Sequence, residues 1–530
     1  MSNSFQKSKC LTPSSQRDEC AKHFTKKIKR GMKRTLLLSL FLSLLLIQTK
    51  AQSDTLRLSL PEVVALAQSD APNALLAETR MRNGYWAYQS SLADFKPAIL
   101  LDGTLPNLNR SIEPITQPDG SEIFKQRAQM RNNLNLSLQQ QIGLTGGTVF
   151  ASTGLQRLDL FLTDAPNLTS YFSTPISIGF SQPLFAVNEL KWSKKIEPLR
   201  YEEAEKGFAE EMENVAYDAS NLFFEIFIAQ LNLEAAKRDK ANADTLFNIS
   251  KGRFEVGRIA ETELLQIELS SMNAAAAVQQ ALLDLQSGTE RLRNFLGIKK
   301  QVFFKLEAPE NIPEFQVAFD EALNLAKQNR SDMVSFQRRL SEADLEVERA
   351  KANSGLQVDL RGRFSLSQTA DNFADAFSSP LDNETFRLGL QIPIADWGKA
   401  KSRMQRACSN RELERINVEQ ERVNFEQEIL LKVKQFDLIR NQVALAVRAY
   451  EVSQKREQMT RNRYFIGKIG VTDLNIAIAE KEGARRGYMN ALREFWLAYY
   501  DLRRITLYDF ERQVSLVRRV DGFEEIECEK

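Results

Sequence analysis

Residues 253–264 read Arg-Phe-Glu-Val-Gly-Arg-Ile-Ala-Glu-Thr-Glu-Leu, and residues 463–474 read Arg-Tyr-Phe-Ile-Gly-Lys-Ile-Gly-Val-Thr-Asp-Leu. Gly257 of the first stretch corresponds to Gly467 of the second, at an offset of 210 residues. A glycine between two helix-favouring segments is typical of a tight turn between helices, because glycine adopts a positive φ at no steric cost. The two stretches therefore predict two helical hairpins of one design.

The same offset recurs upstream, at the ends of two strand-like segments. Ile178–Leu184 matches Leu388–Ile394, which places Pro183 opposite Pro393. Proline suits a strand end and the first turn of a helix, so both prolines are expected to mark where a strand gives way to a helix. An offset that is unchanged between the two motifs predicts one long element without insertions between them.

Between these motifs the sequence favours very long helices. From Val187 to Ser250, and again from about 400 to 460, helix-favouring residues predominate and no proline follows Pro198. A helix of roughly 60 residues is about 90 Å long at 1.5 Å per residue. Returning helices of about 35 residues are expected after the glycine turns, ending at Leu296 and at about Leu507.

Upstream of each long helix the sequence predicts a shorter helix and then strands. The first half opens with a helical pattern from Pro61 to Asp94, which Pro72 should interrupt, because proline cannot donate a hydrogen bond into a helix interior. Alternation of apolar and polar residues follows, which is typical of strands with one apolar face. The expected strands are roughly Ala98–Leu105, Pro175–Gln182, Val358–Ser367 and Phe386–Ile392.

The two halves differ in length at their strands. The opening helices align at an offset of 259, so the first half has about 49 additional residues. These include the alternating segment Leu134–Gln139 and a Gly146-Gly147 turn, which predict an inserted hairpin at about 106–157. The sequence does not decide whether this hairpin joins the other strands or stands above them as an external loop. We expect a first structural repeat at 52–300, a second at 301–510 and a C-terminal tail at 511–530.

Charge and histidine content exclude several classes of function. Lys plus Arg (71) and Asp plus Glu (69) nearly cancel without long runs of one sign, so nucleic acid is not an expected partner. The only histidine, His23, lies upstream of a predicted cleavage site. Ser-His-Asp and Cys-His catalysis and zinc sites built on imidazole are therefore excluded for the mature chain. We expect no metal ion or other cofactor, and whether Cys408 and Cys528 are paired is left open.

The N-terminal sequence predicts export. Basic residues from Lys26 to Arg34 precede an apolar run from Leu36 to Ile47, and Thr49-Lys50-Ala51 is a plausible cleavage site. This run suits a secretory signal and is too short for a membrane-spanning helix, which needs roughly 20 residues. We therefore expect 1–51 to be a signal peptide with a long N-terminal extension, and Met32 is an alternative start.

Four amphipathic strands in one chain cannot stand alone in a bilayer. An open sheet leaves edge amide and carbonyl groups unpaired in hydrocarbon, at a cost of several kcal/mol each. The smallest closed membrane barrels have about eight strands, whereas one chain supplies four, or six with the inserted hairpin. Chains must therefore pool their strands. A trimer with twelve strands is the simplest solution, and assemblies of two chains or of more than three also satisfy the argument.

The residues resemble the TolC family of outer membrane factors over nearly the whole mature chain. The resemblance rests on the tandem halves, on Gln-Pro-Leu-Phe at 182–185 and Gln-Ile-Pro-Ile at 391–394, and on the paired Arg-aromatic-x-x-Gly motifs. It implies a mixed α and β fold, in which a trimeric twelve-stranded β-barrel continues into a long periplasmic α-helical barrel with an equatorial domain. It also implies a homotrimeric channel in the cell outer membrane that extends into the periplasm. The implied partners are a periplasmic adaptor, an inner-membrane pump of RND or ABC type, and outer membrane lipid.

The resemblance further implies a gate at the hairpin tips, where the family's entrance is constricted. Carried over by position, Tyr464 would face Thr262 and Glu263 of the same or a neighbouring subunit and hold the tip closed. A hydrogen bond from a phenol to a carboxylate is charge-assisted, and three copies would bias a closed state by a few kcal/mol. The family's second link is not matched, because Ile469 stands where a gating arginine is expected.

A ring of carboxylates at the entrance is matched in part. Asp473 stands at one of the two family positions and Ile476 at the other. Three copies of Asp473 would focus a negative potential and favour cations. The alternative for Asp473 and Glu263 is a solvated carboxylate that stabilises the first turn of its own helix.

The resemblance also implies a contact surface at the tips. Arg253, Gly257, Arg463 and Gly467 are expected at the hairpin-tip turns, in contact with the adaptor. The alternative for the two arginines is a favourable interaction with the C-terminal end of the helix dipole.

Two other classes of protein are also compatible with the sequence. A periplasmic adaptor also has a long helical hairpin, but it usually has a single hairpin within small β domains, so membrane fractionation separates it from a channel. An enzyme with paired carboxylates, such as a glycosidase, needs no histidine, and turnover of a sugar or ester would reveal it. The transported substrate, the choice between efflux and protein secretion, and the identity of the pump lie beyond the sequence.

Overall fold

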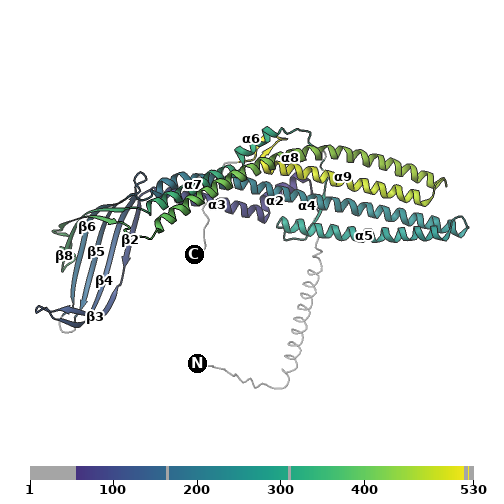
Figure 1. The fold of residues 1–530 in the computed structure, drawn as a ribbon. Helices are drawn as coiled ribbons and strands as arrows, with labels where there is room; N and C mark the ends of the chain where they lie inside the picture. Colours follow the sequence, from purple (N-terminus) through teal and green to yellow (C-terminus); the bar gives the residue numbers. More distant parts are fainter. Residues whose placement is uncertain (1–54, 163–165, 308, 310–311, 518–522, 524–530) are drawn as a thin grey trace, which may run out of the picture. The chain divides into compact units, whose positions relative to one another are not determined.

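The computed structural model describes residues 55–162, 166–307, 309, 312–517 and 523 (Figure 1). The chain divides into a small unit, Met1–Arg57 with Lys299–Lys305, and a large unit, Leu58–Ile298 with Leu306–Lys530. β1 (Thr55–Leu58) and β7 (Phe303–Leu306), each with all but its last residue in the small unit, pair as a two-stranded sheet. The expected signal peptide at 1–51, with His23, and Cys528 lie outside the described residues. Among the described residues, no helix is both long and apolar enough to cross a bilayer.

Four long helices form two antiparallel hairpins in the large unit (Figure 1). α4 (Glu189–Glu255) and α8 (Lys399–Phe465) have 67 residues each, and α8 begins and ends 210 positions after α4. The chain returns as α5 (Glu261–Phe295) with 35 residues and α9 (Val471–Thr506) with 36. At 1.5 Å per residue, each 67-residue helix is about 100 Å long. The two predicted hairpins are confirmed, and both long helices continue about five residues beyond the ends that composition suggested.

The opening helices of the two halves also match in length. α2 (Leu60–Asp70) and α3 (Pro72–Ala93) have 11 and 22 residues, and so do α6 (Phe319–Asn329) and α7 (Ser331–Ala352). Pro72 interrupts the first pair as predicted, because it has no N–H to donate. The second pair is interrupted at Arg330 without a proline, and Arg330 has an extended backbone with a ψ of 150°. Both halves therefore have a break between their opening helices, although only the first break is marked by a proline.

Seven strands of the large unit form one antiparallel sheet, in which six follow the order β2-β4-β5-β6-β8-β9 and β3 pairs with part of β4. The strands are β2 (Ala98–Thr104), β3 (Leu108–Thr116), β4 (Glu122–Gln141), β5 (Thr148–Phe161), β6 (Leu168–Leu184), β8 (Gln357–Ala370) and β9 (Leu381–Gln391). The inserted hairpin is formed by β4 and β5, which lie between β2 and β6 and so belong to the same sheet. β3 was not predicted. The sheet order β2-β4-β5-β6-β8-β9 contains six strands from one chain, whereas a trimer with twelve strands needs only four strands from each chain.

The two faces of the sheet differ in chemistry. One row of directly paired residues crosses five strands through Ser137, Ser152, Ser177, Ser365 and Asn383. The adjacent row, which points to the other face, runs through Leu138, Ala151, Ile178, Phe364 and Glu384. Ser137, Ser177 and Ser365 are at most 5% exposed, whereas Leu138, Ile178 and Phe364 are 42–52% exposed. Three serines of the polar row are therefore enclosed, although Arg361 and Asn383 on the same face are exposed, and the apolar face is open.

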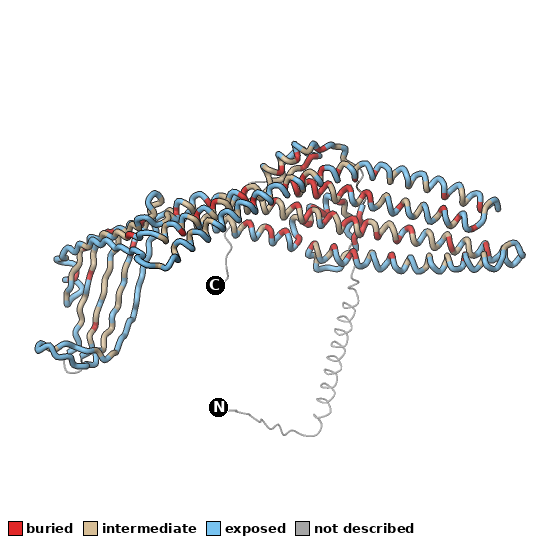
Figure 2. Tube along the Cα trace, viewed as in Figure 1, coloured by how far each residue is buried: buried red, intermediate tan, exposed pale blue. Residues whose placement is uncertain are grey.

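The core of the helical part lies partway along the hairpins. Phe223 and Phe224 of α4 are fully buried, with ring centroids 5.3 Å apart. Phe495 of α9 lies 5.6 Å from Phe436 of α8. Figure 2 shows buried residues gathered along the middle of the helices, while the hairpin ends and the sheet are largely exposed or intermediate. The structure past α9 includes the short pair β10 (Tyr508–Asp509) and β11 (Val514–Ser515).

A buried ion-pair network fastens the end of α9 to α4. Arg503 donates to Glu213 at 3.0 Å, and its guanidinium lies 3.4 Å from a carboxylate oxygen of Asp509. The side chains of Glu213 and Asp509 are 5% and 2% exposed. Burial raises the pKa of Glu213, an effect that Arg503 opposes, and burial raises the pKa of Tyr500 to about 12. Arg503 also lies over the ring of Tyr500, at 5.2 Å, so this network is closely packed.

Candidate gate at the hairpin tips

The two tips have the same backbone hydrogen bonds. After α4, Arg258 N–H donates to the carbonyl of Arg253 at 2.8 Å, and after α8, Lys468 N–H donates to the carbonyl of Arg463 at 3.0 Å. This six-to-one bond defines a Schellman motif, which needs a left-handed residue just after the helix. Gly257 and Gly467 supply it, with φ of 70° and 75°. The positive φ expected of both glycines is thus present, and both arginines lie in the last turn of their helices.

Tyr464 is buried between the two hairpins of one protomer. It is 5% exposed and packs in an apolar cluster with Ile267 of α5 and with Val471 and Leu474 of α9. The guanidinium of Arg253 lies 5.7 Å from the centroid of its ring, a cation–π contact between the two tips. The structure therefore brings Arg253 and Tyr464 together, a contact that the sequence analysis did not predict because no spacing rule relates residues on separate hairpins.

Thr262 and Glu263 lie in the first turn of α5. Thr262 is exposed and Glu263 is half-buried. Within the described protomer, no hydrogen bond joins Tyr464 to either residue, because apolar side chains and Arg253 surround the tyrosine ring. The expected link within one subunit is thus not seen here, and a link between neighbouring subunits stays a prediction.

The remaining tip residues differ in their surroundings. Asp473 is exposed and is the acidic residue of the first turn of α9. Ile469, at the position where the resemblance led us to expect a gating arginine, packs against the cluster around Tyr464. Arg463 is exposed, whereas Arg253 is half-buried against Tyr464. Of these two arginines, Arg463 is therefore the one that is exposed for contact with another protein.

The two junction prolines lie at strand ends and outside the first helical turn. Pro183 is paired with Asp359 at the end of β6, and α4 begins six residues later, at Glu189. Pro393 follows the end of β9 by two residues, and α8 begins at Lys399. The start of α4 is instead capped by Asn188, whose side chain accepts from Lys191 N–H at 3.0 Å. The prolines thus mark the end of each strand, and a short connection precedes each helix.

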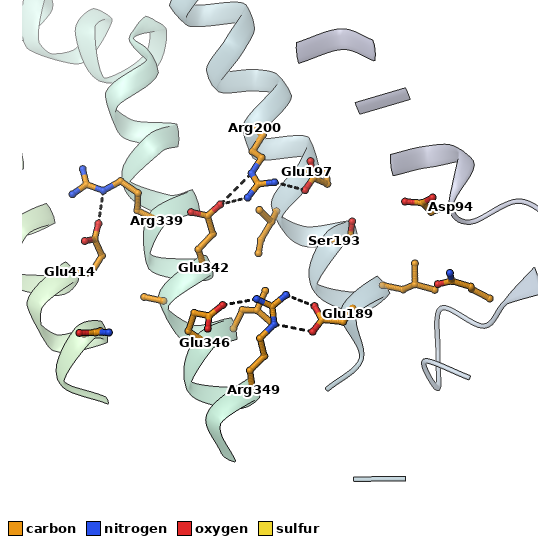
Figure 3. A pocket seen from close by; sticks show the side chains of 16 residues that line it. Asp94, Glu189, Ser193, Glu197, Arg200, Arg339, Glu342, Glu346, Arg349 and Glu414 are labelled. Atoms are coloured by element: carbon orange, nitrogen blue, oxygen red, sulfur yellow. Dashed lines mark hydrogen bonds and ion pairs between the residues drawn. The ribbon is translucent and has the colours of Figure 1, made fainter. Parts of the chain in front are cut away.

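A charged cavity of about 860 Å³ lies where α4, α7 and α8 approach the sheet (Figure 3). Figure 3 shows Arg349 between Glu189 and Glu346, and Arg200 between Glu197 and Glu342. The hydrogen bonds from Arg349 lower the pKa of Glu189. Each arginine is satisfied by carboxylates on its own or a neighbouring helix, so the cluster ties the helices together.

This cavity has the character of a structural junction and lacks features of a ligand site. Ligand sites are mostly apolar with a few polar groups, whereas charged side chains dominate these walls. Glu189 and Arg349 are 160 residues apart, so local sequence patterns gave no signal for the cluster. Among the described residues, no group of three His, Cys, Asp or Glu side chains could hold a metal ion.

Comparisons with known proteins agree with this geometry. Outer membrane protein TolC of Vibrio cholerae serotype O1 is 23% identical over 376 residues, which cover 69% of this chain and 82% of that protein. The fold is similar to the CmeC outer membrane channel of Campylobacter jejuni, with a TM-score of 0.63, 16% identity and coverage of 86% and 87% of the two chains. It is also similar to a membrane protein of Pseudomonas aeruginosa, with a TM-score of 0.62, 14% identity and coverage of 87% and 92%. The family model described as outer membrane efflux protein matches residues 125–298 and 322–506, more than half of the sequence, and the chain therefore belongs to the outer membrane efflux protein family.

Proposed function

We propose that three copies of this chain form a passive conduit from the periplasm to the exterior, as the outer membrane channel of a tripartite efflux or type I secretion system. The observation that supports this most strongly is a sheet with one exposed apolar face and one polar face, joined to two helical hairpins of matched length. Apolar residues on the outside and polar residues on the inside are the pattern of membrane barrels. Membership of the efflux family excludes the adaptor alternative.

The hairpins would form the wall of a periplasmic tunnel. Copies placed side by side bury the apolar stripes of long helices, as in other helical bundles. The repeats proposed at 52–300 and 301–510 would then contribute one hairpin each, which is supported by the equal lengths of α2 and α6, α3 and α7, and α4 and α8. The tips would meet the adaptor, with Arg463 as one exposed basic contact, and a pump of RND or ABC type would lie beyond it.

The gate is proposed to act between subunits. Tyr464 in one protomer would reach Glu263 or Thr262 of its neighbour when the tips converge. The supporting observation is that all three residues lie at the tips, Tyr464 at the end of α8 and the other two in the first turn of α5. An opening movement would separate these pairs while the cluster around Tyr464 stays within its own protomer.

Asp473 is proposed to set ion preference at the entrance. Three exposed carboxylates around one axis would raise the local concentration of cations. Asp473→Asn should therefore lower cation preference, measured as the reversal potential across a planar bilayer with a salt gradient. An unchanged reversal potential would remove this role.

We also propose that the protein has no catalytic activity of its own. A tunnel needs no reaction at its wall, and the buried carboxylate Glu213 is committed to Arg503. Turnover of a sugar or ester by the purified protein would contradict this proposal.

Reconstitution into planar bilayers tests the proposed function. The purified protein should insert and give stepwise conductance increases, and it should fractionate with the outer membrane as a trimer. A stable monomer that neither fractionates with membranes nor inserts into lipid would overturn the proposal.

A further inference from the structure

The inserted hairpin is hydrogen-bonded on both of its sides. β4 pairs with β2 over residues 133–139 and with β5 over Ala128–Gln141. β5 pairs on its other side with β6, from Thr148↔Ser181 to Leu160↔Leu168. A loop standing outside a barrel would leave β2 and β6 adjacent, whereas here two complete strands separate them.

The hairpin also carries the same outward apolar pattern as the rest of the sheet. Leu134, Leu136 and Leu138 of β4 are 41–43% exposed and point to one face. Phe386, Leu388 and Leu390 of β9, at the far edge, are 55–72% exposed on that same face. Between the β4 leucines stand Asn135 and Ser137, which face the polar side, and Ser137 is 4% exposed.

This continuity decides where the hairpin lies. An external hairpin in water gains nothing from a row of exposed leucines, and large exposed apolar patches mark surfaces that another apolar phase covers. A membrane strand, by contrast, needs apolar residues toward lipid and polar residues toward the lumen. The leucines of β4 are in register with Ile99 and Leu101 of β2, so the apolar band of β2 continues onto β4, and Ala151 and Leu155 of β5 lie opposite two of these leucines.

The two edges of the sheet complement each other. β2 and β9 are its terminal strands, and each has a strand partner on one side only in the described part of the chain. Five successive antiparallel pairings separate them, so β2 and β9 run in opposite directions. β9 of one copy can therefore pair antiparallel with β2 of the next, which removes the edges that lipid cannot satisfy.

We propose that three copies close through β9–β2 junctions into a barrel of eighteen strands, six from each copy, in place of the twelve expected for this family. This rests on the trimeric channel proposed above. Barrel diameter grows roughly in proportion to strand number, so the membrane section is about 1.5 times as wide as one of twelve strands. Barrels of about this size leave an aqueous channel, and here polar residues such as Asn135, Ser137 and Ser177 line it.

Site-directed spin labelling tests the strand count. In a variant with all four cysteines replaced by serine, one cysteine at a time is introduced at 134–138 and labelled in lipid vesicles. Labels at Leu134, Leu136 and Leu138 should collide more often with lipid-soluble oxygen than with a water-soluble nickel complex, and labels at Asn135 and Ser137 should show the reverse. The matched control is the same scan at 386–390 of β9, which faces lipid in either architecture.

The outcomes separate the two proposals. Alternation in both scans supports eighteen strands. Alternation at 386–390 with uniform access to nickel at 134–138 would place the hairpin outside the barrel and overturn the strand count, while the channel proposal stands. Uniform access to nickel in both scans would overturn the channel proposal as well.

A disulfide provides a second measurement that does not depend on labelling. Leu100→Cys and Ser137→Cys are directly paired across β2 and β4 and should oxidise within one chain. Leu100→Cys with Ser177→Cys, a residue of β6 two strands farther away, should stay reduced. A bond formed only by the second pair would show β2 beside β6 and contradict the eighteen-stranded barrel.

Discussion

The two halves of this chain agree in their helices and differ in their sheets. α4 and α8 have the same 67 residues of length at one offset, whereas the first half supplies four strands to the main path of the sheet and the second half supplies two. In the proposed channel both tips must reach the same level to form one entrance, which would constrain the lengths of both helices. Strands can be added in pairs because a hairpin leaves the direction of its neighbours unchanged, and antiparallel closure needs an even number.

The halves also differ in how equivalent positions are used. Arg293 of α5 and Arg503 of α9 are related by the 210-residue offset, but Arg293 pairs with Glu290 on its own helix, whereas Arg503 holds the buried Glu213. Residues at equivalent positions therefore need not contribute equally to stability. Substituting the equivalent residue in each half measures the difference.

The largest effect is expected at the buried network. Arg503→Met should lower the free energy of unfolding by about 3–5 kcal/mol, because it leaves the carboxylates of Glu213 and Asp509 buried without their cation. Arg293→Met should cost less, about 0.2–1 kcal/mol, because its partner Glu290 is about half exposed and stays solvated without the arginine. Urea unfolding in detergent measures both. Equal losses in the free energy of unfolding would show that the two arginines contribute equally to stability.

The next largest effect is expected on single-channel conductance when the proposed gate at the hairpin tips is altered. Tyr464→Phe combined with Glu263→Ala should raise single-channel conductance in planar bilayers, since removing a charge-assisted hydrogen bond costs the closed state about 1.5–3 kcal/mol per copy. Arg253→Gln is the matched control, because it removes the cation–π contact within one protomer and leaves the proposed contact between protomers intact. An unchanged conductance in the double variant would argue against the gate.

The two tip glycines should behave alike. Gly257→Ala and Gly467→Ala should each destabilise by about 1 kcal/mol, because both glycines have a positive φ that an L side chain adopts only with strain. Gly252→Ala, inside α4 with open space around it, should instead stabilise by about 0.8–1 kcal/mol. Thermal unfolding of the three variants measures this, and a large difference between Gly257→Ala and Gly467→Ala would contradict the equivalence of the tips.

The smallest effect on stability is expected at the charged cavity where α4, α7 and α8 approach the sheet. Because Arg349 lowers the pKa of Glu189 below its ordinary value of 4.5, their pairing contributes stability that is fully present above about pH 4.5 and is lost as the pH falls through the lowered pKa. Glu189→Gln should cost about 0.2–1 kcal/mol at pH 7 and weaken the loss of stability in acid. The equivalent residue of the second half is Lys399, so Lys399→Gln should leave the acid dependence unchanged. Unfolding midpoints at pH 7 and pH 4 decide between these outcomes.

The sequence predicts the helices well because their signals are local. The 210-residue offset, the glycine turns and the Pro72 break determine helix ends to within a few residues. The second break, at Arg330, was missed because no proline marks it; there the cation pairs with Asp332 at 2.8 Å and lies 5.2 Å from the ring of Phe425.

The site and the sheet order were harder to predict because their contacts are distant in sequence. Alternation predicted most of the strands but not that β4 would lie beside β2, nor that β3 would form. The contact between Arg253 and Tyr464 joins residues of different repeats, and the pair Arg503–Glu213 spans 290 positions. Such contacts depend on packing between elements, which periodicity along one element cannot report.

Disulfide formation between copies is the most direct test that identical partners complete this sheet. In the cysteine-free chain, Leu100→Cys on β2 is combined in turn with Asn383→Cys, Thr385→Cys or Arg387→Cys on β9, all of which point to the polar face. At least one combination, oxidised in outer membranes, should give covalent dimers and trimers, with the trimer as the largest species on a non-reducing gel. Monomers alone in every combination, or a series that extends past the trimer, would contradict closure by three copies.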